Sequence, residues 1–434
     1  MIDIRFIRED SKLVKNNLKK RFQLDKLELI DKILKIDSEW RKRKIDIDNF
    51  RAKRNKVSKE VSDAKKSGKN VSVLLNRARE IPQKIANLEK EANELKDKTD
   101  ELLGLIPNIL HESVPIGENE NKNLEIRTWG KIEKRSFELK NHAELIEELN
   151  LADFETARNV SGAGFNYLLG DLALLDLALQ RYGVDFAMKH GFTLVNPPIM
   201  INNNSFLGVA SGINDIQEIV YKIENEDLYL IGTSEHSLVS MMKEKNIQKT
   251  ELPLKICAVT PCFRKEIGSR GVDTKGLFRM HQFNKVEQVV FSLPEESFKL
   301  LEDMQKITEK LFQSLKIPYR VIEICSGDLS AKFSKQYDIE AWFPRQGKYA
   351  EVTSAGNCTD FQSRALNIKY WDKGERKLVH ILNNTMVATS RTMVAILENY
   401  QQKNGSIKIP TVLIPYMNGK KVIGKIRNEK RKRI

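Results

Sequence analysis

The first hundred residues carry apolar side chains at helical spacing in two consecutive segments. From Ile33 the apolar positions step by three and four residues, and after a turn-like segment at 67–70 the stepping resumes at Ala78 and runs to Ile106. A seam of this period that reverses at a glycine-containing turn predicts two antiparallel helices that form a coiled-coil hairpin. Because proline is poor in a helix interior, the second helix should begin near Pro82 or bend there.

Beyond residue 125 the pattern becomes mixed. Strand-like runs at 228–232, 254–260 and 285–291 lie among amphipathic segments around 171–190, 294–315 and 386–402. Their order lacks a regular βαβ rhythm, which favours an α+β fold over a doubly wound parallel sheet. We therefore expect two domains, a helical one at 1–115 and a mixed one at 116–434.

Composition narrows the class of protein. The chain has 434 residues, of which 41% are hydrophobic and 30% are charged, as in soluble globular proteins. Four cysteines in so long a chain exclude a disulfide scaffold and favour a reducing compartment. Five charged residues within the first ten exclude the apolar core of a signal peptide, and no apolar run approaches the roughly 20 residues that span a bilayer. We expect a cytoplasmic protein without a membrane segment.

The chain is basic, with 73 Lys and Arg against 59 Asp and Glu and a net charge of +14. This excess is consistent with a polyanionic partner. Part of it lies in a tail at 427–433 and part on the first helix of the hairpin. A charge run on a coiled coil is usually a solvated face, and that interpretation is favoured for most of these residues taken singly. The helix cluster comprises Arg41, Lys42, Arg43, Lys44, Arg51, Lys53, Arg54, Lys56 and Lys59.

The densest polar chemistry lies at 262–291, and the sequence has neither a P-loop nor a GxGxxG motif. Arg264 and Glu266 have one residue between them on a strand-like run, so they should point to the same face. After a loop at 268–276, polar and aromatic side chains alternate with other residues. A strand face that carries arginines, an aromatic ring and a carboxylate suits a nucleotide. The alternative, two edge strands whose charges are simply solvated, would not explain an aromatic ring on the charged face. The alternating residues are Arg279, His281, Phe283, Lys285 and Glu287.

Residues 262–291 resemble motif two of the class II aminoacyl-tRNA synthetases, and in particular of the seryl-tRNA synthetases. HGFTLVNPPIM at 190–200 resembles motif one, with Pro198 at its signature proline. NNTMVATSRTMVAILENYQ at 383–401 resembles motif three, with Arg391 opening its helix. The helical hairpin also matches this family. The resemblance implies a catalytic core built on an antiparallel sheet flanked by helices, and the wording of several stretches is closer to archaeal and eukaryotic members than to bacterial ones.

The resemblance also implies a site for ATP and Mg²⁺. Arg264 matches the arginine that grips the α-phosphate, and Phe283 the ring that stacks on adenine opposite Arg391, which matches the arginine at the γ-phosphate. Glu266 matches the carboxylate that reads the adenine amino group, and Glu351 and Ser354 match the magnesium ligands, a donor set suited to a hard cation. Arg264 and Arg391 are the implied catalytic residues. The full implied ATP set is Arg264, Lys265, Glu266, Arg279, Met280, Phe283, Glu351, Val352, Thr353, Ser354 and Arg391.

The same resemblance implies a serine site at Thr233, Ser234, Glu235, Arg264, Glu287 and Thr385. A small polar pocket rejects alanine and glycine because they leave its groups unpaired, and threonine would be excluded by size. Each residue also has a plain structural alternative. Thr233 could cap the helix that begins near Glu235, Thr385 could cap the helix that runs to Tyr400, and Glu351 alone would be a surface carboxylate.

Zinc is not expected. Cys257 and Cys262 lie five residues apart without a CxxC or HxxxH pattern, and the zinc-dependent branch of this family has a ligand pattern that is absent here. His281 lies beside the expected site, but an in-line displacement by a bound carboxylate depends on orientation and charge neutralisation rather than on a general base.

The function implied is that of a serine–tRNA ligase. L-serine and Mg·ATP would give seryl-adenylate, and the acyl group would pass to the 3′-terminal adenosine of tRNA(Ser), with tRNA(Sec) as a further expected substrate. The hairpin would lie along the tRNA and contact mostly phosphate and sugar, and motif one would form a homodimer. A paralogue that charges a carrier protein, and an inactive RNA-binding protein, are the alternatives. The tRNA-binding residues implied are Arg41, Arg43, Lys44, Arg51, Lys53 and Arg54.

Overall fold

The computed structural model describes residues 1–210, 220–266 and 276–424, so the basic tail at 427–433 and most of the loop at 268–276 lie outside the described residues. The chain divides into two compact units, Met1–Pro107 and Asn108–Ile434. The sequence pattern placed this division after residue 115. It lies earlier because Asn108 already belongs to the second unit, where its side-chain amide donates hydrogen bonds to the carbonyl oxygens of Lys332 (3.0 Å) and Cys358 (2.8 Å).

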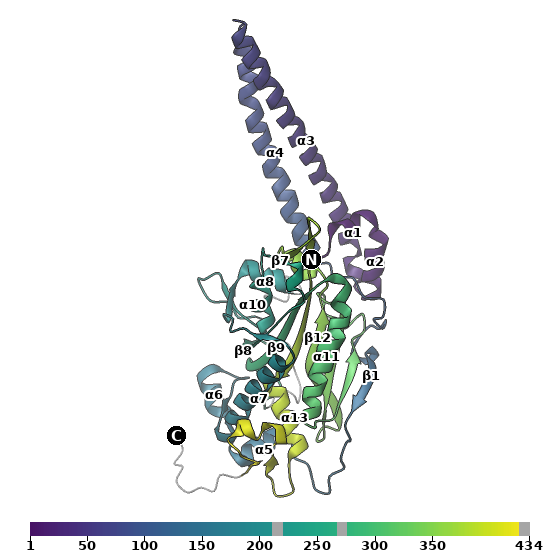
Figure 1. The fold of residues 1–434 in the computed structure, drawn as a ribbon, viewed down its shortest axis with the longest axis vertical. Helices are drawn as coiled ribbons and strands as arrows, with labels where there is room; N and C mark the ends of the chain where they lie inside the picture. Colours follow the sequence, from purple (N-terminus) through teal and green to yellow (C-terminus); the bar gives the residue numbers. More distant parts are fainter. Residues whose placement is uncertain (211–219, 267–275, 425–434) are drawn as a thin grey trace. The chain divides into compact units, whose positions relative to one another are not determined.

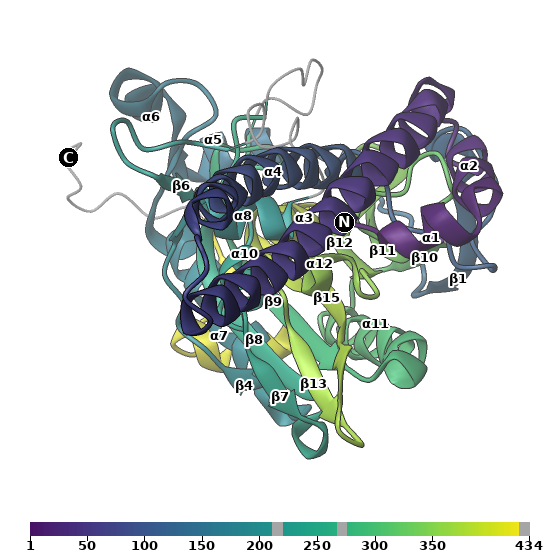
Figure 2. The same cartoon turned by 90° about the horizontal axis from the view of Figure 1, so that it is seen from above.

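The first unit contains two short helices, α1 (Ile4–Glu9) and α2 (Ser11–Lys20), and two long ones, α3 (Leu27–Lys66) and α4 (Ser72–Gly104). Figures 1 and 2 both show α3 and α4 side by side as the predicted hairpin. Val57 of α3 packs against Ile81 and Ile85 of α4 in the apolar seam. Pro82 lies inside α4, so the prediction that the helix would begin near this proline is wrong. Its neighbour Ile81 is buried on the seam, and this packing offsets the hydrogen bond that a proline removes.

The second unit is built on an eight-stranded sheet. Each pair of neighbouring strands is antiparallel except β4–β8, which is parallel. The mixed, mostly antiparallel architecture confirms the α+β prediction. In spatial order the strands are β1 (Leu124–Trp129), β10 (Tyr319–Glu323), β11 (Lys335–Phe343), β12 (Lys348–Asn357), β15 (His380–Ala388), β9 (Gln282–Ser292), β8 (Leu254–Phe263) and β4 (Thr193–Leu194).

Alternation along the central strands separates the core from the candidate site. Val286 and Val290 of β9 belong to a large apolar core that also contains the buried faces of three helices, α7 (Gly170–Lys189), α11 (Ser297–Ser314) and α13 (Thr389–Tyr400). Val289 and Phe291 belong instead to a second apolar cluster. Since successive side chains of a strand point to opposite faces, Lys285 and Glu287 share the face of this second cluster. Figure 1 shows α11 lying along the sheet.

Short elements complete the second unit. Two helices, α8 (Asn203–Val209) and α10 (Ser234–Ser240), supply buried residues to the second cluster. No helix among the described residues is long and apolar enough to cross a membrane. The other α-helices and strands of the described residues are α5 (His142–Leu149), α6 (Phe154–Ser161), α12 (Phe361–Ala365), β2 (Ala152–Asp153), β3 (Tyr167–Leu168), β5 (Met200–Asn202), β6 (Leu228–Leu230), β7 (Asn246–Gln248), β13 (Lys369–Asp372), β14 (Glu375–Leu378), β16 (Ile407–Lys408) and β17 (Val422–Ile423).

Candidate active site

A cavity of about 440 Å³ lies in the second unit and is lined by residues from the central strands β9, β12 and β15 and from the first turns of α10 and α13. Most of the residues expected from the sequence line it. Lys265 does not line the cavity, and Ser234 is fully buried at the start of α10. The expected residues that line it are Thr233, Glu235, Arg264, Glu266, Arg279, Met280, Phe283, Glu287, Glu351, Val352, Thr353, Ser354, Thr385 and Arg391.

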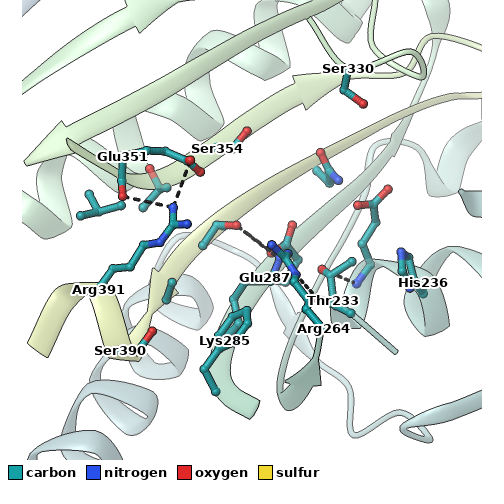
Figure 3. A pocket seen from close by; sticks show the side chains of 18 of the residues that line it. Thr233, His236, Arg264, Lys285, Glu287, Ser330, Glu351, Ser354, Ser390 and Arg391 are labelled. Atoms are coloured by element: carbon teal, nitrogen blue, oxygen red, sulfur yellow. Dashed lines mark hydrogen bonds and ion pairs between the residues drawn. The ribbon is translucent and has the colours of Figure 1, made fainter. Parts of the chain in front are cut away.

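Arg391 lies at one end of the cavity. It projects from the first turn of α13, and its guanidinium pairs with the carboxylate of Glu351 at 3.0 Å (Figure 3). Its Cζ atom lies 5.3 Å from the ring centre of Phe278, whereas the cation above the ring of Phe283 is Arg264, also at 5.3 Å. In this structure, therefore, Arg391 faces Phe278, an aromatic residue that the sequence analysis did not identify.

Three side chains with oxygen atoms that could bind a cation lie near this end, those of Ser354, Asp338 and Glu351. Ser354 on β12 pairs in register with Asp338 on β11, and the Gln336 amide donates to both Ser354 Oγ (3.1 Å) and Asp338 Oδ1 (3.0 Å). Burial, together with the nearby Glu351 charge, raises the pKa of Asp338 well above its usual value. A buried carboxylate, a second carboxylate and a hydroxyl form a donor set of the kind that hard divalent cations bind. Among the described residues, no group of three or more His, Cys, Asp or Glu side chains is arranged to hold a metal ion.

The other end of the cavity holds a buried pair on β9. Glu287 is only 2% exposed, and its Oε2 atom lies 2.7 Å from Lys285 Nζ and accepts a hydrogen bond of 3.1 Å from the Thr385 hydroxyl. Burial raises the pKa of Glu287, and Lys285 opposes that shift. Thr385 lies within β15, four residues before α13 begins at Thr389, so the alternative in which it caps this helix is wrong.

A second buried pair flanks the first. Thr233 caps α10, because its hydroxyl accepts a hydrogen bond from the Glu235 amide at 3.3 Å, which confirms the capping interpretation. The Glu235 carboxylate accepts from Lys332 Nζ at 2.6 and 2.7 Å and from the Gln362 amide at 2.7 Å. Burial alone would raise the pKa of Glu235. The Lys332 charge, the nearby His236 and the hydrogen bonds from Lys332 and Gln362 together outweigh burial and lower that pKa to about 2. Lys332 and Gln362 lie 97 and 127 residues from Glu235 in the chain, and no sequence signal pointed to them.

The two strands expected at 262–291 are shorter than the sequence pattern predicted. β8 ends at Phe263 and Glu266 has a φ angle of 49°, so the argument that strand alternation aligns Arg264 with Glu266 is wrong, although both residues line the cavity. Arg279 also precedes the strand, because β9 begins at Gln282. His281 does not line the cavity. Its Nδ1 atom lies 2.6 Å from the Tyr221 hydroxyl.

In the first unit, three of the expected tRNA-binding arginines form ion pairs within the hairpin. Arg41 pairs with Asp37 at 3.2 Å on the same helix, Arg43 with Glu91 at 2.7 Å and Arg51 with Glu89 at 2.7 Å. The last two pairs join α3 to α4. All six expected residues, Arg41, Arg43, Lys44, Arg51, Lys53 and Arg54, have exposed side chains.

Comparison with known proteins agrees with this fold. The family model described as tRNA synthetase class II core domain (G, H, P, S and T) matches residues 220–400, the region that contains most of the cavity. The fold is thus that of a class II aminoacyl-tRNA synthetase. The model described as seryl-tRNA synthetase N-terminal domain matches residues 1–110, the unit that carries the hairpin. The two models thus match the first unit and the larger part of the second.

Full-length relatives identify the family. The chain is 47% identical over 422 residues to the serine–tRNA ligase of Methanocella arvoryzae, covering 96% of this chain and 99% of the relative. A crystal structure of seryl-tRNA synthetase from Pyrococcus horikoshii complexed with ATP superposes with a TM-score of 0.92 at 46% identity, over 98% of this chain and all of that one. The cytoplasmic enzyme of Naegleria fowleri with AMP gives 0.86 at 34% identity, over 98% and 99% of the two chains. The chain belongs to the seryl-tRNA synthetase family, the serine–tRNA ligases. Its archaeal relatives confirm the prediction that the sequence is closer to archaeal and eukaryotic members than to bacterial ones.

Proposed function

We propose that this chain catalyses both steps of serine–tRNA ligation, formation of seryl-adenylate from L-serine and ATP and transfer of the seryl group to the 3′-terminal adenosine of tRNA(Ser). The observation that carries the proposal is the division of one cavity into two chemically distinct ends. One end presents Arg391, Glu351 and Ser354, and the other presents the carboxylates of Glu235 and Glu287. A triphosphate suits the first end and a small amino acid suits the second.

Arg264 would bind groups of both ATP and serine. Its Nε atom donates a hydrogen bond to the Gly232 carbonyl at 3.2 Å, and its guanidinium lies over Phe283. A guanidinium held there can bind the α-phosphate of ATP and the carboxylate of serine together, which brings the two reacting groups into line. Phe283 would stack on adenine and Glu266 would read its amino group, with Arg279 and Arg391 on the outer phosphates.

Mg²⁺ would be held by the oxygen donors of Glu351 and Ser354, which line the cavity, with the buried Asp338 carboxylate beside Ser354 on the neighbouring strand. The buried Asp338 carboxylate lies in the field of a second carboxylate, and a divalent cation would relieve this repulsion. When bound, the ion would neutralise phosphate charge. The residues of this chain would hold it and direct the phosphates toward Arg391.

The serine end can recognise a hydroxyl. One oxygen of Glu287, Oε2, accepts a hydrogen bond from the Thr385 hydroxyl and pairs with the Lys285 ammonium. We assign the serine hydroxyl to Glu287 and Thr385 and the serine ammonium to Glu235, at the start of α10. Alanine would leave these buried groups unpaired, and such sites discriminate strongly against analogues that lack the hydroxyl.

A homodimer through the motif-one region is supported by large apolar side chains that are exposed on the second unit. They belong to neighbouring elements, α7, β4, β5 and α8, at or beside residues 190–200. Their exposed fractions are 60% for Leu177, 49% for Met188, 43% for Leu194, 41% for Met200 and 44% for Leu207. A second copy of the chain would cover a patch of this kind.

The hairpin of the first unit would bind tRNA. Its exposed basic side chains on α3, among them Lys44, Lys53 and Arg54, suit contacts to phosphate and sugar, which read the shape of the tRNA rather than its base edges. We further propose tRNA(Sec) as a second substrate and a cytoplasmic location.

The test is serine-dependent exchange between ATP and pyrophosphate, followed by charging of total tRNA. Exchange and charging are both expected. Absence of exchange would refute the enzymatic proposal, and exchange without charging would favour a paralogue that charges a carrier protein. Replacing serine by alanine or threonine in the same assay provides the control for substrate choice.

A further inference from the structure

Lys332 brings a positive charge to the amino-acid end of the cavity. The residue is 9% exposed and lines the cavity, and its Nζ atom lies 2.6 Å from Oε1 and 2.7 Å from Oε2 of Glu235. An ammonium that contacts both oxygens of one carboxylate restricts rotation of that carboxylate. The contact is therefore positioned to set the orientation of Glu235.

The segment that carries Lys332 is itself held in place. The Lys332 carbonyl accepts a hydrogen bond from the side-chain amide of Asn108 at 3.0 Å, and the Phe333 backbone amide donates to the Ser330 carbonyl at 3.0 Å. The Ser334 amide donates to the Asn357 carbonyl at the end of β12. The cation thus comes from a backbone fixed independently of α10, the helix that carries Glu235.

The contacts of Glu235 leave room for a ligand. A carboxylate has about four lone-pair positions. Oε1 accepts from Lys332 and Gln362, and Oε2 accepts from Lys332 alone among the described residues. One position on Oε2, at a cavity-lining residue, can therefore accept from the ammonium of an amino acid.

We propose that Lys332 is a positioning residue of the amino-acid site, whose ammonium orients Glu235 so that the remaining lone pair on Oε2 binds the ammonium of serine. The inference rests on the proposed function, because it takes Glu235 as a serine ligand. The opposite arrangement, in which Lys332 occupies the place of the substrate ammonium and hinders binding, is an outcome that the test distinguishes.

The surrounding charges determine how the site should respond to pH. The titratable groups that act on the pair are His236 on α10, Glu287 on β9 and Cys358 after β12, and Lys285 and Arg264 act in turn on His236. If Lys332 is replaced by an apolar residue, Glu235 loses its nearest cation. Burial is then less opposed, and the pKa of Glu235 will rise. Serine binding will then improve as pH rises and Glu235 ionises.

The experiment compares Lys332→Met with Lys348→Met, a change at an exposed lysine at the start of β12. KM for serine and for ATP are measured by pyrophosphate exchange from about pH 6 to about pH 9. We expect Lys332→Met to raise the serine KM about tenfold or more near neutral pH, with the defect shrinking as pH rises, and to change the ATP KM less than about twofold. Lys332→Arg, which keeps the charge, should recover part of the loss, and Lys348→Met should behave as wild type.

An unchanged or lower serine KM in Lys332→Met, a pH-independent defect, or equal rises in both KM values would overturn the inference. Lys332→Gln keeps a hydrogen-bond donor without the charge and provides the same test if the methionine variant does not fold. Absence of serine-dependent exchange in the wild-type protein would overturn the proposed function, and this inference with it. Normal exchange in the wild type together with an unchanged variant overturns this inference alone.

Discussion

Replacing Thr385 by valine removes one hydroxyl from the amino-acid end of the cavity while nearly preserving side-chain shape. In the structure this hydroxyl donates to Glu287 Oε2 at 3.1 Å, and Glu287 is 2% exposed, so no solvent replaces the lost donor. A hydrogen bond to a charged group contributes about 1.5–3 kcal/mol. At about 1.4 kcal/mol per factor of ten, the loss corresponds to roughly a 10- to 150-fold effect on serine binding.

The assay is serine-dependent pyrophosphate exchange with serine and ATP varied separately. We expect Thr385→Val to raise the serine KM by that factor and to leave the ATP KM within about twofold of wild type. Because the Thr385 hydrogen bond lowers the pKa of Glu287, its removal should also shift the acid limb of kcat/KM for serine to higher pH. Thr385→Ser retains the hydroxyl and is the matched control.

Two results would refute this reasoning. A serine KM unchanged by Thr385→Val would show that the Glu287 cluster does not bind the substrate. A parallel rise in both KM values would indicate a general disturbance of β15 rather than the loss of one contact. The ratio of serine to alanine activation provides a further check, since discrimination against alanine should fall in Thr385→Val and persist in Thr385→Ser.

Four further predictions follow from the same structure. Phe283→Ala should raise the ATP KM by about tenfold and spare the serine KM, because a stacked aromatic contributes about 1–3 kcal/mol; normal ATP affinity would contradict the stacking role. Deleting residues 35–100 should abolish tRNA charging and preserve pyrophosphate exchange, and equal loss of both activities would contradict the division between hairpin and catalytic unit. Leu177→Asp should shift the chain from dimer to monomer in sedimentation, whereas an unchanged mass would place the dimer interface elsewhere. Burial lowers the pKa of His236 to about 3, so the unfolded chain binds a proton first as pH falls below about 6.5 and stability should decline between these values; His236→Gln should show a smaller fall in melting temperature between about pH 7 and about pH 4.5.

Local periodicity accounted for the hairpin well, because the contacts between α3 and α4 recur with the helical repeat. At Pro82 the alternative in which the helix begins there is wrong, because Pro82 lies inside α4 and its neighbours Ile81 and Ile85 pack against α3. Strand alternation placed Lys285 and Glu287 on one face of β9. It could not apply to Glu266, because β8 ends at Phe263 and the following backbone leaves the extended conformation.

The candidate site was predictable where family spacing marks single positions, as at Arg264, Glu287 and Arg391, all of which line the cavity. It was not predictable where the chemistry depends on contacts between distant segments. Lys332 and Asp338 carry no local motif, and each matters only because the fold brings it to a partner on another element. A single sequence contains no direct record of those pairings.

The paired charges that line the cavity have a consequence for how this enzyme can change over evolutionary time. Glu287 is paired with Lys285, and Glu235 with Lys332, and all four residues line the cavity while being at most 9% exposed. Removing one member of a buried pair costs about 3–5 kcal/mol, whereas replacing both by apolar residues can be nearly neutral. Drift toward another amino acid would therefore have to pass through coordinated double substitutions, each single step being selected against. The two pairs therefore make a change of amino-acid substrate by single substitutions difficult.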